Sequence, residues 1–266
     1  MRTIPLFSFA TASLLFVALS TVAQAGAKTC TAMSGDQRVA LIELYTSEGC
    51  SSCPPADNWL SQLRGKGLGP DKAVPLAFHV DYWDYIGWKD RFAKPEHTER
   101  QRETAGNNRL RTIYTPQVVI NGRDFRHWYW GDSAERTVDK INGARAKAKI
   151  SLTLSEISNL QVRVNARIAV KPSPHPVHSV AYLALYQNRQ ESAVSSGENT
   201  GKKLKHNHVV RELLGPFPIR KDGMLSIDQT LNLNPSWKRA DIGVAAFVQE
   251  EGTGDVLQVL AQPVCT

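Results

Sequence analysis

Cys50 and Cys53 form a C-x-x-C motif that lies between a strongly apolar segment and a pair of prolines. The apolar segment, residues 38–45, suits a buried strand. Pro54 and Pro55 fit the first turn of a helix, where the missing backbone N–H of proline costs nothing. We therefore predict that both cysteines lie at the junction of a strand and the helix that follows it.

The segments after the motif predict a mixed order of helices and strands. We expect the order strand, helix, strand, helix, strand, strand, helix over residues 38–149. Asn121-Gly122 is typical of a two-residue hairpin turn. After the first helix, the expected segments are a strand at 74–80, a helix from about Pro95, strands at 117–120 and 124–130, and a helix at 132–149.

After about residue 149 the pattern becomes β-rich, and turn signals separate the apolar segments. We predict a compact all-β region over residues 150–266, of sandwich type. Its expected strands are 150–154, 160–170, 180–186, 208–213, 224–231, 242–249 and 256–260.

Residues 1–25 have the features of a secretory signal peptide. A positive start, an apolar stretch and Ala23-Gln24-Ala25 predict cleavage before Gly26. The alternative is an uncleaved membrane anchor. We expect an exported protein, periplasmic or secreted, which works in an oxidising compartment.

Composition excludes several classes of protein. A mean hydropathy of −0.31 excludes a polytopic membrane protein, and no stable membrane insertion is expected once the signal is removed. The chain has 266 residues and a formal net charge of +7. This surplus is diffuse, and an exported chain is a poor candidate for binding nucleic acid, so we expect no nucleic-acid partner.

Four cysteines allow three disulfide pairings. The simplest joins Cys50 to Cys53 and Cys30 to Cys265, so that the second bond connects the two ends of the mature chain. Such a long closed loop favours a large stabilisation. The alternatives are that Cys30 and Cys265 are free, or that one of them pairs between chains.

The first region resembles a thioredoxin fold. The resemblance rests on the C-x-x-C that opens a helix and on Thr115-Pro116 before a hairpin. It implies an α/β thioredoxin-like N-terminal domain over residues 26–149, with a helical and aromatic insertion near 81–111. A smaller all-β sandwich-like C-terminal domain over 150–266 would follow. It also implies that Pro116 is cis and lies against the C-x-x-C.

The mature chain is also similar to a family of secreted bacterial proteins known as domain of unknown function 1223. The similarity is carried by residues 44–57, 79–84, 114–117, 197–201 and 209–211. This family supports the thioredoxin-like fold and implies no established activity.

The motif predicts thiol–disulfide chemistry. A helix N-terminus favours a thiolate on Cys50, which would attack, while Cys53 would resolve the mixed disulfide. Ser51 and Ser52 are placed to donate hydrogen bonds to the Cys50 sulfur. Glu43 is the nearest candidate for a buried acid that relays protons, although an edge charge is an equal interpretation.

Three functions remain open on these residues. The first is an exported thiol–disulfide oxidoreductase with protein or small-thiol partners and no cofactor, in which Thr115 and Pro116 help to hold the substrate. The second is a non-enzymatic binding module with a structural Cys50–Cys53 disulfide. The third is a periplasmic copper-binding chaperone.

Two further groups of residues have weaker patterns. His206 and His208 with the C-x-x-C would suit copper or zinc, but we favour a solvated strand edge and expect no metal. His79 and Asp81 end a strand where ligands bind in open α/β sheets, or they form a structural hydrogen bond. The aromatic residues of segment 82–88 form either a substrate platform or, as we favour, a packed core.

Overall fold

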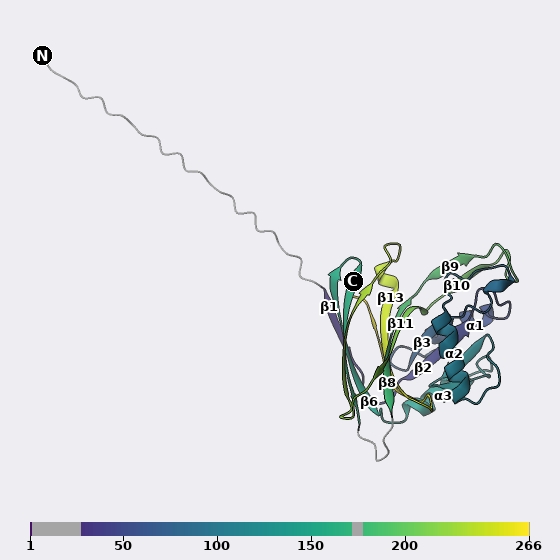
Figure 1. Cartoon of the computed structure of the whole chain (residues 1–266), viewed down its shortest axis with the longest axis horizontal. Coiled ribbons are helices and arrows are strands. Elements are labelled where there is room, and N and C mark those ends of the chain that lie inside the picture. The colour runs from purple at the N-terminus through teal and green to yellow at the C-terminus, as the bar shows by residue number, and fades with distance from the viewer. Residues whose placement is uncertain (2–27, 172–177, 266) are drawn as a thin grey trace.

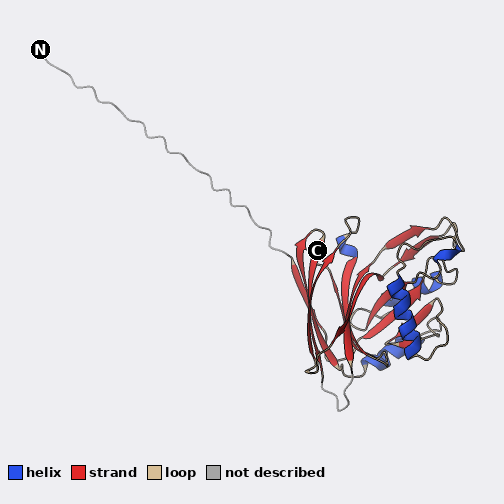
Figure 2. Cartoon of the chain, in the orientation of Figure 1, coloured by secondary structure: helices blue, strands red, loops and turns tan. Residues whose placement is uncertain are grey.

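The computed structural model describes Met1 and residues 28–171 and 178–265. Apart from Met1, the predicted signal peptide lies outside these residues. The described part of the chain is mostly β, with three α-helices gathered on one side of the molecule (Figure 2). No helix within it is both long and apolar enough to cross a membrane.

Eight strands form one large sheet that contains both halves of the chain. Its order is β14-β13-β8-β11-β3-β2-β4-β5. Val209 of β11 pairs in parallel with Ala77 of β3, and this pair joins the two halves. The first half provides β2 (Ala40–Thr46), β3 (Ala73–His79), β4 (Gln117–Ile120) and β5 (Arg123–Asp124). The second half provides β8 (Ser179–Gln187), β11 (Val209–Pro218), β13 (Ile242–Glu250) and β14 (Val256–Pro263).

A smaller sheet covers the β14-β13-β8 part of the large one. It has the order β1-β6-β7-β12. Alternate side chains of its strands, among them Ile150 and Leu152, pack against Leu183, Leu185 and their neighbours in one apolar core. Its strands are β1 (Thr29–Met33), β6 (Ala148–Ser158), β7 (Gln161–Val170) and β12 (Met224–Asn232).

Helices cover the rest of the large sheet. α1 (Pro54–Ser61) and α3 (Ser133–Asn142) pack on one face of β2 and β4. α2 (Pro95–Asn107) packs near β3 and sends Arg100 into the core of the other face. A separate two-stranded ribbon, β9 (Gln190–Ala193) and β10 (Lys203–His206), extends beside α1 (Figure 1).

The predicted fold class is wrong. We expected an α/β thioredoxin-like domain followed by a smaller all-β domain, whereas the chain is mostly β and its large sheet passes through both regions. The apolar residues of β3 predict a buried strand, but they do not indicate which strand pairs with it in the sheet. Both faces of β3 are buried and its free edge requires a partner, which β11 supplies from more than 100 residues further along the chain.

The individual helices and strands agree with the sequence-based predictions better than the overall architecture does. Segment 117–120 is a strand, as predicted, and Asn121-Gly122 turns the chain with positive φ angles of 54° and 82°. The return strand is only β5, and the last helix ends at Asn142 with Gly143 as its C-cap, before β6 begins at Ala148. β1, β9 and β10 were not among the strands expected from the sequence.

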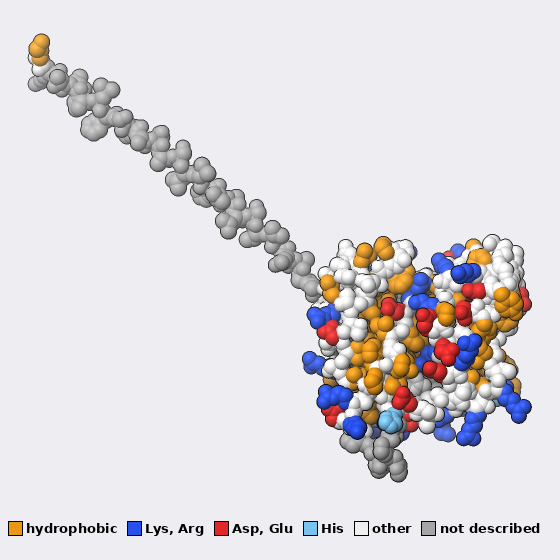
Figure 3. All heavy atoms as spheres, in the orientation of Figure 1, with side chains coloured by type: hydrophobic (Ala, Val, Ile, Leu, Met, Phe, Trp, Pro, Cys, Tyr) orange, Lys and Arg blue, Asp and Glu red, His pale blue; other side chains and the backbone are white. Residues whose placement is uncertain are grey.

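Charge on the surface is mixed. On the face drawn in Figure 3, basic and acidic side chains alternate, with apolar side chains between them. This face has no continuous basic patch of the kind that binds nucleic acid.

Candidate functional site

Cys50 and Cys53 form a disulfide at the start of α1, with their Cα atoms 5.5 Å apart. β2 ends at Thr46, a short turn follows, and Cys53 is the N-cap residue of the helix. The backbone N–H groups of Ala56 and Asp57 donate to the Cys53 carbonyl over 2.9 and 3.2 Å. The positive end of the helix therefore lies at this disulfide and favours a thiolate once the bond is reduced.

A pocket of about 390 Å³ lies beside the C-x-x-C motif. Ser52 of the motif lines it together with Thr115 and Pro116, which are joined by a cis peptide bond. Tyr129 stands at this pocket and is 60% exposed. The other lining residues are Tyr114, Val118, Arg126 and Trp128. The structure thus brings together Ser52, Thr115 and Pro116, which the sequence analysis had assigned to one site.

Trp83 connects the turn before the motif to Thr115. Its indole Nε1 donates a hydrogen bond of 2.7 Å to Thr115 Oγ1. Gly49 leaves room for this tryptophan, since a Cβ atom at position 49 would lie 3.2 Å from the Cβ of Trp83. The aromatic segment is therefore packed at Trp83, while Tyr85 remains 83% exposed.

A loop from the second half of the chain covers the motif. Asn199 Nδ2 donates hydrogen bonds to the backbone carbonyls of Glu48 and Cys50, over 2.8 and 3.0 Å. The backbone N–H of Ser51 donates to Glu198 Oε2 over 3.1 Å. Under this loop Cys50 is 1% exposed.

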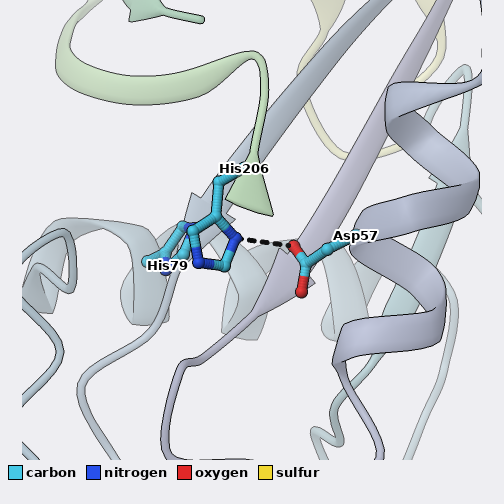
Figure 4. Close-up of side chains that lie close together, drawn as sticks. All are labelled: Asp57, His79 and His206. Atoms are coloured by element: carbon cyan, nitrogen blue, oxygen red, sulfur yellow. Dashed lines mark ion pairs between the residues drawn. The ribbon is translucent and has the colours of Figure 1, made fainter. Parts of the chain in front are cut away.

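Five titratable side chains are buried together at the carboxyl ends of β2 and β3. Asp57 lies on α1 one turn after Cys53, and His79 and His206 are the last residues of β3 and β10 (Figure 4). Each member of this buried cluster is at most 5% exposed: Glu48, Asp57, His79, Asp90 and His206.

Ion pairs connect the buried cluster. His79 Nδ1 lies 2.6 Å from Asp90 Oδ2, which also accepts the Glu48 backbone N–H over 2.8 Å. His206 lies between two carboxylates: its Nδ1 is 3.5 Å from Asp57 Oδ1, and its Nε2 is 3.3 Å from Glu48 Oε1.

Burial and mutual attraction compete in this cluster. Burial lowers the pKa of His206, but the carboxylates of Asp57 and Glu48 outweigh it and raise that pKa to about 10. Burial also raises the pKa of Glu48 and of Asp90, yet His206 and His79 respectively hold both below their usual values. The carboxylates of Glu48 and Asp90 therefore stay ionised, and His206 carries a positive charge between Glu48 and Asp57.

Glu43 lies on the other face of β2. Its Oε1 accepts a hydrogen bond of 2.7 Å from Arg100 Nε and one of 3.3 Å from the Tyr45 hydroxyl. Side chains alternate along a strand, so Leu44 packs against α1 while Glu43 points away from it. Glu43 is fully buried, so the edge charge that we considered is wrong, and among the described residues its hydrogen bonds go to Arg100 and Tyr45 rather than to the C-x-x-C.

Cys30 of β1 forms a disulfide with Cys265. Both side chains pack against the core between the two sheets. Figure 1 shows β1 and the C-terminus together, at the opposite end of the molecule from α1. This bond therefore connects the chain ends and takes no part in the site.

His206 and His208 lie in different segments, since His206 ends β10 and His208 immediately precedes β11. His206 is 2% exposed and belongs to the buried cluster, so the solvated edge that we expected for it is wrong. His208 itself has a positive φ of 58°, and its ring centroid lies 6.0 Å from that of Tyr186. Burial lowers the pKa of His208 to about 4.

His79 and His206 were candidates from the sequence, but their contact with Glu48, Asp57 and Asp90 and the role of Asn199 were not predicted. Glu48 and Asp57 gave a usable signal, because acids that flank a C-x-x-C inside apolar segments require buried partners. No local pattern indicates the partners of His206 or Asn199, since both contact residues about 150 positions away.

Comparisons identify similar proteins. Protein AGR_C_4864 from Agrobacterium tumefaciens is 25% identical, covers 87% of this chain and 96% of its own, and has a TM-score of 0.59. HBP35 of Porphyromonas gingivalis is 14% identical, covers 87% of this chain and 76% of its own, and has a TM-score of 0.66, which shows the fold alone. No match was found among curated proteins. A family model of proteins of unknown function, DUF1223, matches residues 41–249, and the chain therefore belongs to the DUF1223 family.

Proposed function

We propose that this chain is an exported thiol–disulfide exchange protein that uses Cys50 and Cys53. The observation that carries the proposal is the position of this disulfide at the N-terminus of α1, beside the pocket that Ser52 and Pro116 line. A helix N-terminus lowers the pKa of an adjacent thiol and so supplies a reactive thiolate. Export is supported by the two disulfides, which persist in oxidising compartments.

The proposed exchange has two balanced steps. A partner thiolate attacks Cys50 Sγ, the bond to Cys53 breaks, and its electron pair leaves with Cys53 Sγ, which then takes up a proton. A second thiolate of the partner attacks the partner sulfur of this mixed disulfide and releases Cys50 as a thiolate. The partner dithiol becomes a disulfide and the C-x-x-C becomes a dithiol; the reverse steps reduce a partner disulfide.

The side chains around the disulfide have different roles in this exchange. Ser52 Oγ lies 3.3 Å from Cys50 Sγ and is placed to donate a hydrogen bond to the thiolate. Trp128 and Tyr129 give the pocket an aromatic surface for an apolar side chain of a protein partner. A small thiol needs to reach only the Cys50 sulfur in order to react, and it does not need the pocket.

One observation favours a second function. Cys50 is 1% exposed, and Asn199 fixes the backbone on both sides of Gly49. This arrangement suits a binding module in which the disulfide is structural and the pocket holds a ligand.

A redox titration separates the two functions. The protein is equilibrated with glutathione buffers, its thiols are alkylated, and the alkylated species are counted by mass. We expect Cys50–Cys53 to titrate at a potential above about −270 mV. Cys53→Ser should trap mixed disulfides, and the matched control Cys50→Ser/Cys53→Ser should trap none. A bond that resists reduction below about −300 mV, with nothing trapped, would leave the binding module as the function.

A further inference from the structure

We propose that Asp57, His79 and His206 form a buried site for a divalent transition-metal ion, with zinc as the best match to the donors. One donor atom from each of these side chains lies within 4.8 Å of the other two. They converge from α1, β3 and β10 (Figure 4). None of its donors is sulfur, so the ion would be held without Cys50 or Cys53.

His79 is oriented in the way that metal-binding histidines are. Its Nδ1 is bound to Asp90 Oδ2 at 2.6 Å, and the residue is fully buried. Its Nε2 is buried with no hydrogen-bond partner among the described residues. A carboxylate on one ring nitrogen fixes the tautomer and orientation of a metal-binding histidine, and the other nitrogen then faces the ion. A metal ion would satisfy this Nε2 atom, which is otherwise costly to bury.

His206 and Asp57 are separated as two ligands of one ion would be. His206 Nδ1 lies 3.5 Å from Asp57 Oδ1, and within the described chain neither ring nitrogen of His206 makes a hydrogen bond of good geometry. Zinc bonds of about 2.0–2.1 Å in a tetrahedral site place neighbouring donors roughly 3.3–3.4 Å apart. Glu48 faces the other nitrogen, as Asp90 does on His79.

The charges of the buried cluster also favour a cation. Glu48, Asp57 and Asp90 are three buried carboxylates. Among the described residues, their ion-pair partners are the two histidines, with no lysine or arginine. A divalent ion would displace the proton of His206, add one further positive charge beside the three carboxylates and give His79 Nε2 a partner. Two imidazoles and one carboxylate match a zinc donor set with one position open.

Zinc alone is the probe for this site. The full chain is stripped with a chelator and titrated with Zn²⁺, and its bound zinc is then measured by elemental analysis after gel filtration. We expect one zinc per chain and a higher melting temperature. X-ray absorption should show nitrogen and oxygen at about 2.0–2.1 Å and no sulfur at 2.3 Å.

Matched variants assign the ligands. His206→Gln and Asp57→Asn should each lower zinc affinity by about 100-fold or more, and Asp90→Asn by about 10- to 100-fold. His127→Gln removes an exposed histidine and should leave affinity unchanged. Cys50→Ser/Cys53→Ser should also bind zinc like the wild type, so this site can fail or stand independently of disulfide exchange.

Three results would overturn the proposal. They are no retained zinc in the wild type, equal affinity in the wild type and Asp57→Asn, or a sulfur shell that disappears in the cysteine double variant. Circular dichroism checks that each variant is folded. Asp57→Asn keeps the size of the side chain, so it tests the site even if His206→Gln does not fold.

Discussion

Arg100 Nε donates a hydrogen bond of 2.7 Å to Glu43 Oε1 inside the core, and the two side chains are 4% and 0% exposed. The guanidinium lies over the rings of Phe78, Tyr182 and Phe247, at 5.6, 4.9 and 4.9 Å from their centroids. These rings come from both halves of the chain. One ion pair therefore connects α2, the first half of the large sheet and the second.

Removal of Arg100 should be strongly destabilising. Arg100→Ala leaves the Glu43 carboxylate buried without its partner, and we expect the free energy of unfolding to fall by about 3–5 kcal/mol. Glu43→Leu/Arg100→Met, which removes both charges at similar volume, should cost less. Urea unfolding measures both. Arg102→Ala, at a side chain 58% exposed, is the control and should change stability by about 0.5 kcal/mol or less; equal costs at the two arginines would contradict this interpretation.

The Cys30–Cys265 bond should affect stability and leave the C-x-x-C unchanged. It joins residues 235 positions apart. Cys30→Ser/Cys265→Ser should lower the free energy of unfolding by about 5 kcal/mol, because the unfolded chain gains the entropy of a very long open loop. Thermal unfolding measures the loss, and alkylation measures the potential of Cys50–Cys53. A shift in that potential would show that the two disulfides are coupled.

Asn199 should control how fast Cys50–Cys53 is reduced. Asn199→Ala removes two hydrogen bonds to the backbone around the motif. Since each is worth about 0.5–1.5 kcal/mol, we expect reduction by dithiothreitol to be about tenfold faster. Asn232→Ala removes one side-chain bond to Gln161 at the exposed edge of the smaller sheet and serves as the control. Identical reduction rates in the two variants would mean that the Asn199 loop does not protect the disulfide.

Tyr129 should matter for protein partners and not for small thiols. It lines the pocket and is 60% exposed. If the proposed exchange operates, Tyr129→Ala should slow reaction with a reduced protein substrate about 3- to 10-fold, since one aromatic contact is worth about 0.5–1.5 kcal/mol. Its reaction with glutathione should stay constant. Tyr85→Ala, an exposed tyrosine outside the pocket lining, should match the wild type in both assays.

Local structure was largely predictable because it depends on neighbouring residues. The apolar segment before Cys50 and the prolines after Cys53 correctly predicted β2 and α1. Alternating apolar residues located most strands of the second half. These signals have the periods of strands and helices, and short-range sterics determine both periods.

Long-range contacts were not predictable in this way. The parallel pair of Ala77 and Val209 depends on which strand reaches the open edge of β3, and no periodicity encodes that choice. His206 reaches Asp57 because the β9–β10 ribbon extends beside α1, a contact between residues 149 positions apart in sequence. The sequence therefore predicts the part of the site at the C-x-x-C and Thr115-Pro116, but not the contacts of the buried cluster.

The junction of β3 and β11 has a consequence for self-association. A chain that stopped at residue 149 would leave the β3 edge without its pair at Ala77 and would uncover Val74, Leu76 and Phe78, which pack in one core with residues of the second half. Open apolar strand edges act as templates on which other chains add as new strands. The second half thus acts as a covalently attached cap that blocks polymerisation at this edge, and its loss would convert the first half into a seed for aggregates.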